Sequence, residues 1–174
     1  AIHVNHNLQA AAADFEWHVR HVCQRYQIPL AVCHVQARAS SGQSPEEAAR
    51  TARYPALAHA ALHHWGQAMG SVLLAQHADD QAESVLLAWS RGAGLSGLAA
   101  MPTRIERHGV PFVRPWLGVS GEALRNTLRH LGLPWIEDPT NHSEAYTRNR
   151  IRHQVLPVLE SALPGSRTTL VRTA

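Results

Sequence analysis

Residues 73–84, which read LLAQHADDQAES, constrain the fold of this chain more than any other stretch. A short apolar run ends abruptly at His77, and Asp79 and Asp80 then open an amphipathic helix. The chain has only four aspartates, so half of them lie at this one turn. A strand that leads into a helix is where open α/β sheets bind ligands, at the carboxyl edge of the strands. The stretch therefore predicts a chemical site where two carboxylates could hold a magnesium ion, position a cationic amine or accept a proton.

Short apolar runs alternate with helical patterns along the whole chain. The apolar runs predict strands at residues 2–6, 30–35, 71–75 and 110–113. The helical period predicts helices at residues 14–26, 44–65, 80–91, 120–131 and about 147–160, with bends at Pro55 and Pro157. Polar or glycine-spaced loops are predicted at residues 37–43, 92–101 and 135–141. Strands that alternate with helices of this length predict an α/β fold with a doubly wound, mostly parallel sheet.

Length and composition are typical of one globular domain with a buried core, at 174 residues and 45% hydrophobic content. No run approaches the roughly 20 apolar residues of a membrane span, and the N-terminus has no signal-peptide pattern. We therefore expect a cytoplasmic protein with no membrane partner. Cys23 and Cys33 have no CxxC spacing, which argues against zinc ribbons and redox pairs and favours buried free thiols.

All 16 basic residues are arginines, which excludes a lysine nucleophile, a Schiff base and a Walker-type phosphate loop. Arginine suits phosphate recognition because its planar fork bonds two oxygens at once, although a coding bias explains the same composition. The net charge of +3 and the pI of about 9.4 permit a nucleic-acid partner. The 13 histidines show no HExxH or comparable spacing, so no transition-metal site is expected.

The acidic pair also has a purely structural explanation. Residues 80–83 form a capping-box pattern, and negative charge favours the N-terminus of a helix. Capping accounts for one aspartate but leaves Asp79 and His77 unexplained. Both interpretations stay open at this point.

The arginines near the C-terminus are equally open to two interpretations. Arg148 and Arg152 are four residues apart and share one face of the last predicted helix, whereas Arg150 points elsewhere. A bound phosphate would favour this arrangement, and a solvated basic face explains it as well. Residues 137–141, with two acids and an asparagine, are more often a turn than a site.

Seven segments cover nearly the whole chain from residue 2 to residue 160: HVNHNLQ, EEAARTARY, LLAQHADDQAESVLL, RGAGLSGLAAM, VRPWL, GLPWIEDPTN and RNRIRHQVLPVLE. In this order they resemble the tRNA(Ile)-lysidine synthases of the PP-loop ATP pyrophosphatase superfamily. The combination of HADDQAE with EDPTN and RNRIR is highly specific, whereas any one of them alone is not. The resemblance implies a fold like the adenine nucleotide alpha hydrolases, with residues 1–146 as the catalytic core and residues 147–174 as a terminal helix and the start of a linker.

The resemblance implies a ligase that attaches L-lysine to C2 of the wobble cytidine of tRNA(Ile) with a CAU anticodon. In that family ATP adenylates the C2 oxygen and releases pyrophosphate, and the lysine amine then displaces AMP. The implied cofactors are ATP and Mg²⁺, and a homodimer is expected.

Roles for individual residues follow from the same resemblance. The residues expected to be catalytic are His77, Asp79, Asp80 and Arg148. Contacts with ATP are expected from His77, Asp80 and Arg53, and contacts with Mg²⁺ from Asp79 and Asp80. Contacts with lysine or tRNA are expected from Glu83, Arg91, Arg114, Glu137, Asn141, Asn149 and Arg152.

The serine-glycine-glycine-x-aspartate-serine loop of the superfamily is absent from the chain. We therefore expect truncation at both ends, a sheet that lacks its first strand and phosphate loop, and a fragment that is inactive alone. Each buried backbone group left unpaired by a missing strand costs about 1–3 kcal/mol, so the strands at residues 2–6 and 71–75 are not expected to pair directly. Either further residues complete the sheet, or it is closed by rearrangement or by a second chain.

Two rival functions remain open. One is thiolation of a tRNA cytidine, which normally needs paired cysteines, and Cys23 and Cys33 are poorly spaced for that. The other is a non-catalytic RNA-binding module, which the absent phosphate loop makes plausible.

Overall fold

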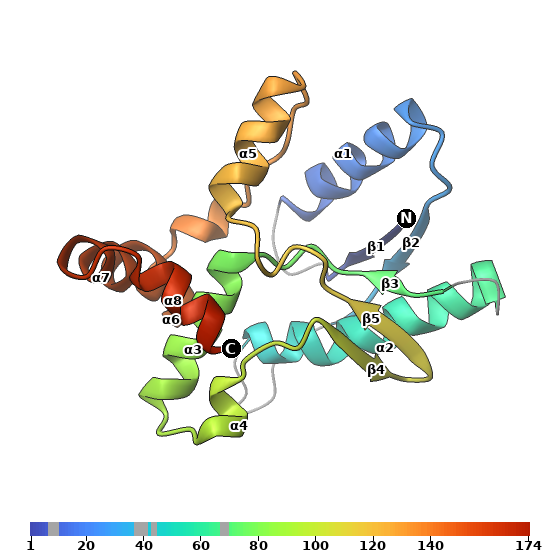
Figure 1. Cartoon of the computed structure of the whole chain (residues 1–174). Coiled ribbons are helices and arrows are strands. Elements are labelled where there is room, and N and C mark those ends of the chain that lie inside the picture. Colours follow the sequence, from blue (N-terminus) through green and yellow to red (C-terminus); the bar gives the residue numbers. More distant parts are fainter. Residues whose placement is uncertain (7–10, 37–41, 43–44, 67–69) are drawn as a thin grey trace. The chain divides into compact units, whose positions relative to one another are not determined.

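The computed structural model of the chain describes residues 1–6, 11–36, 42, 45–66 and 70–174 (Figure 1). These residues form two compact units. Unit 1 comprises Ala1–Val72 and Glu106–Phe112, and unit 2 comprises Leu73–Ile105 and Val113–Ala174. Most of the loop predicted at residues 37–43, and the predicted helix cap Ser44, lie outside the described residues. None of the described helices is both long and apolar enough to cross a membrane.

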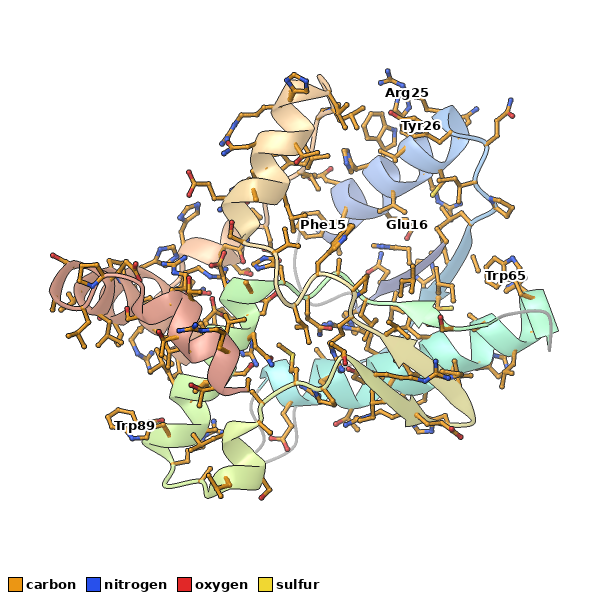
Figure 2. The ribbon with its side chains drawn as sticks, in the orientation of Figure 1. Phe15, Glu16, Arg25, Tyr26, Trp65 and Trp89 are labelled. Carbon is orange, nitrogen blue, oxygen red and sulfur yellow. The ribbon has the colours of Figure 1, made fainter. Side chains whose placement is uncertain are left out.

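Unit 1 contains a parallel β–α–β arrangement and a long second helix. Its elements are β1 (Ile2–Asn5), α1 (Ala12–Arg25), β2 (Ala31–His34) and α2 (Pro45–Trp65). The strands β1 and β2 pair in parallel, with Ile2 opposite Ala31, and α1 forms the crossover between them. Glu16 of α1, labelled in Figure 2, accepts a hydrogen bond from the buried Asn5 side chain at 3.0 Å, so α1 is tied to the end of β1.

The core of unit 1 lies on one face of α2. Small side chains let a helix approach a sheet closely, and α2 buries alanines along this face, among them Ala58 and Ala61. The Tyr54 ring packs edge-on against the Phe112 ring, with 5.0 Å between the centroids. The helix runs through Pro55 without ending, although proline cannot donate a backbone hydrogen bond.

Unit 2 is mostly helical. Its helices are α3 (Ala78–Ser90), α4 (Leu95–Leu98), α5 (Gly121–His130), a 3₁₀ turn (Pro139–His142), α6 (Thr147–Arg150), a π-helical segment (Ile151–Val155), α7 (Leu156–Ala162) and α8 (Ser166–Thr173). The core is formed by Ala82, Leu86, Ile151 and Leu156, with Leu170 of α8 packed against it. Helix α8 packs along α3, as Figure 1 shows.

The sheets correct the expectation of a single doubly wound, mostly parallel sheet. The strands β1 and β2 form one small sheet, and a second sheet has the order β3-β5-β4, with β3 at Val72–Leu73, β4 at Arg104–Arg107 and β5 at Val110–Val113. His108 and Gly109 connect β4 and β5, and both have positive φ, 52° and 71°. Two such residues form the tight turn of an antiparallel hairpin, so this sheet is not purely parallel. β1 and β3 belong to different sheets and do not pair directly.

Four elements differ from the sequence-based expectations. Strand β4 reads RIER, which has too little apolar alternation to predict a strand. The predicted loop at residues 92–101 contains the one-turn helix α4, and the polar helix α8 was not predicted. The predicted helix at residues 147–160 is divided into α6, the π-helical segment and α7, because Pro157 cannot supply a backbone donor to the preceding turn.

Candidate active site at the N-terminus of helix α3

Helix α3 begins immediately after His77, which is its N-cap residue. The backbone N–H of His77 donates to Oδ2 of Asp80 at 2.9 Å. The sequence predicted a capping box that starts at Asp80, and this prediction is wrong by three residues: Asp80 is the third helical residue and reaches back to the cap. His77 is itself held by a parallel bridge to Trp116, so the turn has a defined position within unit 2.

Asp79 has a different role from Asp80. Its carboxylate is buried and accepts two hydrogen bonds from other elements of unit 2. Oδ2 accepts from the backbone N–H of Gly121 at 3.0 Å, and Oδ1 accepts from the Arg167 guanidinium at 2.8 Å. Capping therefore explains Asp80 but not Asp79. The carboxylate of Asp79 instead ties the start of α5 and the first turn of α8 to α3.

The imidazole of His77 lies against both carboxylates. Its Nδ1 is 3.7 Å from Oδ2 of Asp79 and 3.7 Å from Oδ2 of Asp80, which is beyond hydrogen-bonding distance. Nδ1 is buried and accepts or donates no hydrogen bond within the part of the chain that the structure describes. One ring nitrogen and two carboxylates therefore lie together at the start of α3.

Glu83 forms the deepest part of the site, one helical turn after Asp80. Its side chain is fully buried and accepts a hydrogen bond from Nε of Arg152 at 2.7 Å. Burial raises the pKa of the Glu83 carboxyl, and the hydrogen bond from Arg152 opposes this shift. Arg152 also lies 3.6 Å from Asp80, and Arg148 lies 3.8 Å from Glu83. The two arginines thus face the acids of α3.

The contacts of the C-terminal arginines argue against one of the two interpretations, the solvated basic face, and phosphate binding stays a prediction. Arg148 donates to Ser84 Oγ at 3.2 Å, and Ser84 donates to the Asp80 carbonyl at 2.8 Å. Arg150 points elsewhere, as predicted, and bonds the carbonyl oxygens of Glu144 and Ala145. Arg148 and Arg152 are therefore not a bare solvated face. We call His77, Asp79, Asp80, Glu83, Arg148 and Arg152 together the acid–arginine cluster.

Other predicted site residues of unit 2 have structural partners outside this cluster. Arg114 is almost fully buried and bonds Gln76 and the Pro102 carbonyl. Asn149 donates to the carbonyl oxygens of Thr140 and Ser143 and so holds the 3₁₀ turn. Their predicted contacts with lysine or tRNA stay predictions.

The remaining predicted residues lie on the surface or in unit 1. Glu137 accepts from the Trp135 ring at 2.7 Å, and the carbonyl of Asn141 is 2.9 Å from the His153 ring. Arg91 is the exposed C-cap of α3. Arg53 belongs to unit 1, where its Nε donates to Nε2 of His6 at 3.4 Å.

Two residues of the site were missed from the sequence. Gly121 looked like an ordinary residue at the start of a helix, but a Cβ there would lie 2.8 Å from Asp79 Oδ2 and 3.1 Å from Cε1 of His77. Arg167 lies 88 residues from Asp79 in a polar segment that predicted no helix, so no local pattern signalled its contact. Both became visible only once the chain was folded.

The site was also expected to hold Mg²⁺ on Asp79 and Asp80. No group of three or more histidine, cysteine, aspartate or glutamate side chains suited to a metal ion occurs among the described residues. Both oxygens of Asp79 already accept hydrogen bonds, and arginines lie beside both aspartates. With these partners in place the two aspartates do not form a ligand set for Mg²⁺, and no chemical step is derived through this ion.

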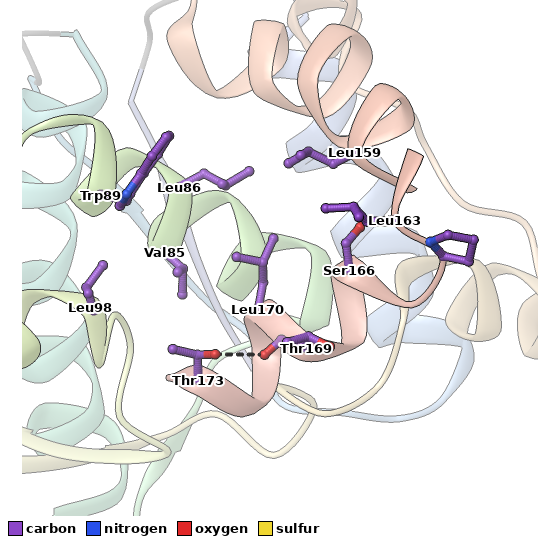
Figure 3. Close-up of a pocket in the computed structure, with 11 residues that line it drawn as sticks. Val85, Leu86, Trp89, Leu98, Leu159, Leu163, Ser166, Thr169, Leu170 and Thr173 are labelled. Carbon is purple, nitrogen blue, oxygen red and sulfur yellow. Dashed lines mark hydrogen bonds between the residues drawn. The ribbon is translucent and has the colours of Figure 1, made fainter. Parts of the chain in front are cut away.

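An apolar cavity of about 510 Å³ lies on another side of α3 (Figure 3). Its lining comes mainly from α3, α4, α7 and α8 and is mostly apolar, with the hydroxyl-bearing Ser166, Thr169 and Thr173 on one side and the exposed Trp89 among the lining residues. None of the residues that line it is charged. It therefore has none of the charged groups that acid–base chemistry needs, and the acid–arginine cluster remains the candidate site.

The fold and this cluster define an α/β domain of the PP-loop type. The family model described as the PP-loop domain matches residues 1–159. The chain therefore belongs to the PP-loop domain family.

Individual relatives carry a more specific name than the family model does. The chain is 50% identical over 174 residues to the tRNA(Ile)-lysidine synthase of Polaromonas naphthalenivorans (strain CJ2) and covers 52% of that protein. It is 44% identical to the tRNA(Ile)-lysidine synthase of Pseudomonas syringae pv. tomato and 43% identical to that of Escherichia coli O157:H7, with 38% and 39% of those proteins covered. In all three comparisons the match spans 100% of this chain, so the chain spans about half the length of these relatives or less.

A solved structure supports the fold. The U34-tRNA thiolase NcsA from Methanococcus maripaludis, solved with its 4Fe-4S cluster, aligns with a TM-score of 0.77. The alignment covers 99% of this chain and 58% of the thiolase at 17% sequence identity. At this identity the likeness shows a common fold and nothing about the reaction.

Proposed function

We propose that this chain is part of a cytoplasmic tRNA(Ile)-lysidine synthase, with residues 1–146 as its catalytic core and residues 147–174 as a terminal helix and the start of a linker. The enzyme would ligate L-lysine to C2 of the wobble cytidine of tRNA(Ile) with a CAU anticodon, and would convert ATP to AMP and pyrophosphate. Sequence identity of 50% to one such synthase over the whole chain supports the proposal. A homodimer stays a prediction.

The observation that carries the proposal is the acid–arginine cluster at the start of α3. An amine nucleophile needs a carboxylate that holds its ammonium form and a base that takes its proton. Asp79 and Asp80 are the carboxylates, and the ring nitrogen Nδ1 of His77 lies 3.7 Å from both. The guanidinium groups of the arginines carry a positive charge, which stabilises the negative charge of the departing AMP.

The proposed reaction has two steps, adenylation of the cytidine and attack by the lysine amine. The C2 oxygen of the cytidine attacks the α-phosphorus of ATP, and pyrophosphate leaves. Asp79 and Asp80 together hold the lysine ammonium group, and His77 takes its proton. The free amine then forms a bond to C2, and AMP leaves with the former C2 oxygen while Arg148 stabilises its charge. Mg²⁺ would accompany the ATP phosphates, since this ion is usually held by few carboxylates and by substrate phosphates.

Asp80→Asn tests the proposal in the full-length product of the gene. Asparagine keeps an oxygen that can cap the helix at His77, so the change removes the charge and leaves the fold. We expect the rate of lysine incorporation into tRNA(Ile) to fall about 100-fold or more. The matched control is Asp14→Asn, an exposed aspartate in the first turn of α1, which should leave the rate unchanged. An unchanged rate in Asp80→Asn would show that the site is assigned wrongly.

Cytidine thiolation, another tRNA modification expected within the PP-loop superfamily, is the closest alternative. The two cysteines of this chain are both free, and Cys23 is buried in α1. Burial also raises the pKa of the Cys33 thiol, which disfavours the reactive thiolate. These observations favour the ligase. A non-catalytic RNA-binding role would appear as tRNA binding by the full-length product without ATP binding.

A further inference from the structure

The guanidinium of Arg167 is bonded to Asp79, one of the two carboxylates to which the proposed function assigns the substrate amine. Its guanidinium donates to Oδ1 of Asp79 at 2.8 Å, from the first turn of α8. The Arg167 side chain is 37% exposed, whereas the Asp79 side chain is 11% exposed. A cation therefore already sits on the solvent side of this buried carboxylate.

The two oxygens of Asp79 are used differently. Oδ2 accepts from the backbone N–H of Gly121 at 3.0 Å, and this contact does not involve Arg167. The carboxylate thus keeps its orientation if Arg167 leaves. Oδ1, which Arg167 occupies, is then available to a different donor.

Arg167 can also leave without disturbing α8. Its backbone N–H donates to Oε2 of Glu160 at 3.0 Å, and Glu160 accepts further hydrogen bonds from the Gly165 backbone and the Ser166 hydroxyl. These contacts fix the first turn of the helix through the backbone. The side chain needs only to give up its bond to Asp79 and turn toward solvent.

Resting on the proposed function, we propose that Arg167 is an internal substitute for the substrate's ammonium group. In the resting site its guanidinium takes the Asp79 oxygen that the ammonium group of lysine takes during the reaction. This contact keeps the charge of the buried Asp79 carboxylate paired when no substrate is bound. It also favours a cationic substrate, because a neutral molecule that displaced Arg167 would leave the Asp79 charge unpaired. Arg167 is therefore a competitor that the substrate displaces.

Competition between Arg167 and lysine would lower the apparent affinity for lysine. A binding site that is open only part of the time binds its ligand with an apparent affinity reduced by the open fraction. If the ion pair between the partly exposed Arg167 and the buried Asp79 has modest strength, the site is open about one fifth of the time. Removal of the Arg167 side chain then strengthens apparent lysine binding about fivefold. The chemical step is unaffected, because Asp80, His77 and the other arginines keep their contacts.

The test is the lysine dependence of lysidine formation by the full-length product, measured for the wild type and for Arg167→Ala. We expect KM for lysine to fall about fivefold, with kcat within about twofold of the wild type. Arg167→Gln, which keeps length and donors but not charge, should shift KM in the same direction and covers the case in which Arg167→Ala fails to fold. Arg172→Ala is the matched control, since Arg172 lies exposed on the same helix and donates to the Thr169 hydroxyl at 3.5 Å.

The outcomes separate the two proposals. No lysidine formation by the wild type, or activity insensitive to Asp80→Asn, overturns the proposed function. An active, Asp80-dependent wild type whose KM for lysine is unchanged or raised in Arg167→Ala and Arg167→Gln overturns only the role of Arg167. A fall in kcat at constant KM also overturns it, because Arg167 would then position Asp79 for catalysis rather than compete with substrate.

Discussion

At the scale of single residues, three acids within five positions of one helix have three different roles. Asp80 caps α3, Asp79 joins α3 to α5 and α8, and Glu83 is buried against Arg152. Their chemical type is similar, so the difference comes from what lies around each carboxylate. Two predictions follow from these surroundings.

The first concerns the closeness of Gly121 to the site. A Cβ at Gly121 would lie 2.8 Å from Asp79 Oδ2, so Gly121→Ala forces the carboxylate or His77 to move. We expect the free energy of unfolding to fall by about 1–3 kcal/mol, together with a loss of lysine incorporation. Thermal unfolding and the incorporation assay measure both effects. Gly118→Ala is the control, since a Cβ at Gly118 meets nothing within 4 Å; equal effects of the two changes would contradict the argument.

The second concerns the pH dependence of stability through Glu83. Burial raises the pKa of Glu83, so between its ordinary and its raised pKa the folded state holds more protons than the unfolded state. Stability therefore falls as pH rises through this window, which starts near the ordinary value of 4.5. The free energy of unfolding of the wild type relative to Glu83→Gln, from urea denaturation, should decrease from about pH 4 upward and then level off.

Glu160 supplies a control of opposite sign. Hydrogen bonds from the backbone of Arg167 and Gly165 and from Ser166 lower the pKa of Glu160. Its contribution is present above the ordinary pKa and is lost as pH falls through the lowered one. The wild type relative to Glu160→Gln should thus gain stability as pH rises. If the stability difference between wild type and variant changed with pH in the same direction for Glu83→Gln and Glu160→Gln, the assigned pKa shifts would be wrong.

At the scale of elements, the start of α5 was predicted correctly, whereas the cap of α3 was not. The start of α5 was predicted at Ser120, and in the structure Ser120 is the N-cap, with its Oγ accepting from the Ala123 backbone at 3.1 Å. A serine cap satisfies a backbone donor locally, so its signal is contained in the neighbouring residues. The helix that approaches Pro157 shows the opposite case. Proline indicated an interruption there, but not that it takes the form of a π-helical segment.

The cap at Ser120 yields a prediction at this scale. Ser120→Ala removes the side-chain acceptor for the Ala123 N–H and should lower the free energy of unfolding by about 1 kcal/mol, or about 2–4 °C in Tm. Thermal unfolding followed by circular dichroism measures the change. In the control Thr127→Ala, on the same exposed helix, the lost hydroxyl bonds only the Ala123 carbonyl within the helix, so Tm should hardly change. A Tm of Ser120→Ala equal to that of the wild type would contradict the capping role.

At the scale of the whole molecule, the resemblance seen in the sequence was confirmed and the expected sheet was not. The PP-loop domain family matches residues 1–159, and strands β1, β2 and β5 formed close to their predicted positions. The expected single parallel sheet is replaced by two small sheets, one of which contains the β4–β5 hairpin. Strand pairing depends on partners far apart in sequence, which a local apolar pattern cannot identify.

The sequence by itself determined where the turn of the candidate site lies, because a strand end, a helix start and an acidic pair are all encoded within residues 73–84. It also determined the family, through several segments whose combination is specific. Only the tertiary structure decided which aspartate caps the helix, that Glu83 is buried beside Arg152, and that Gly121 and Arg167 reach Asp79. Burial and charge pairing arise from contacts between residues tens of positions apart, and these contacts exist only in the folded chain.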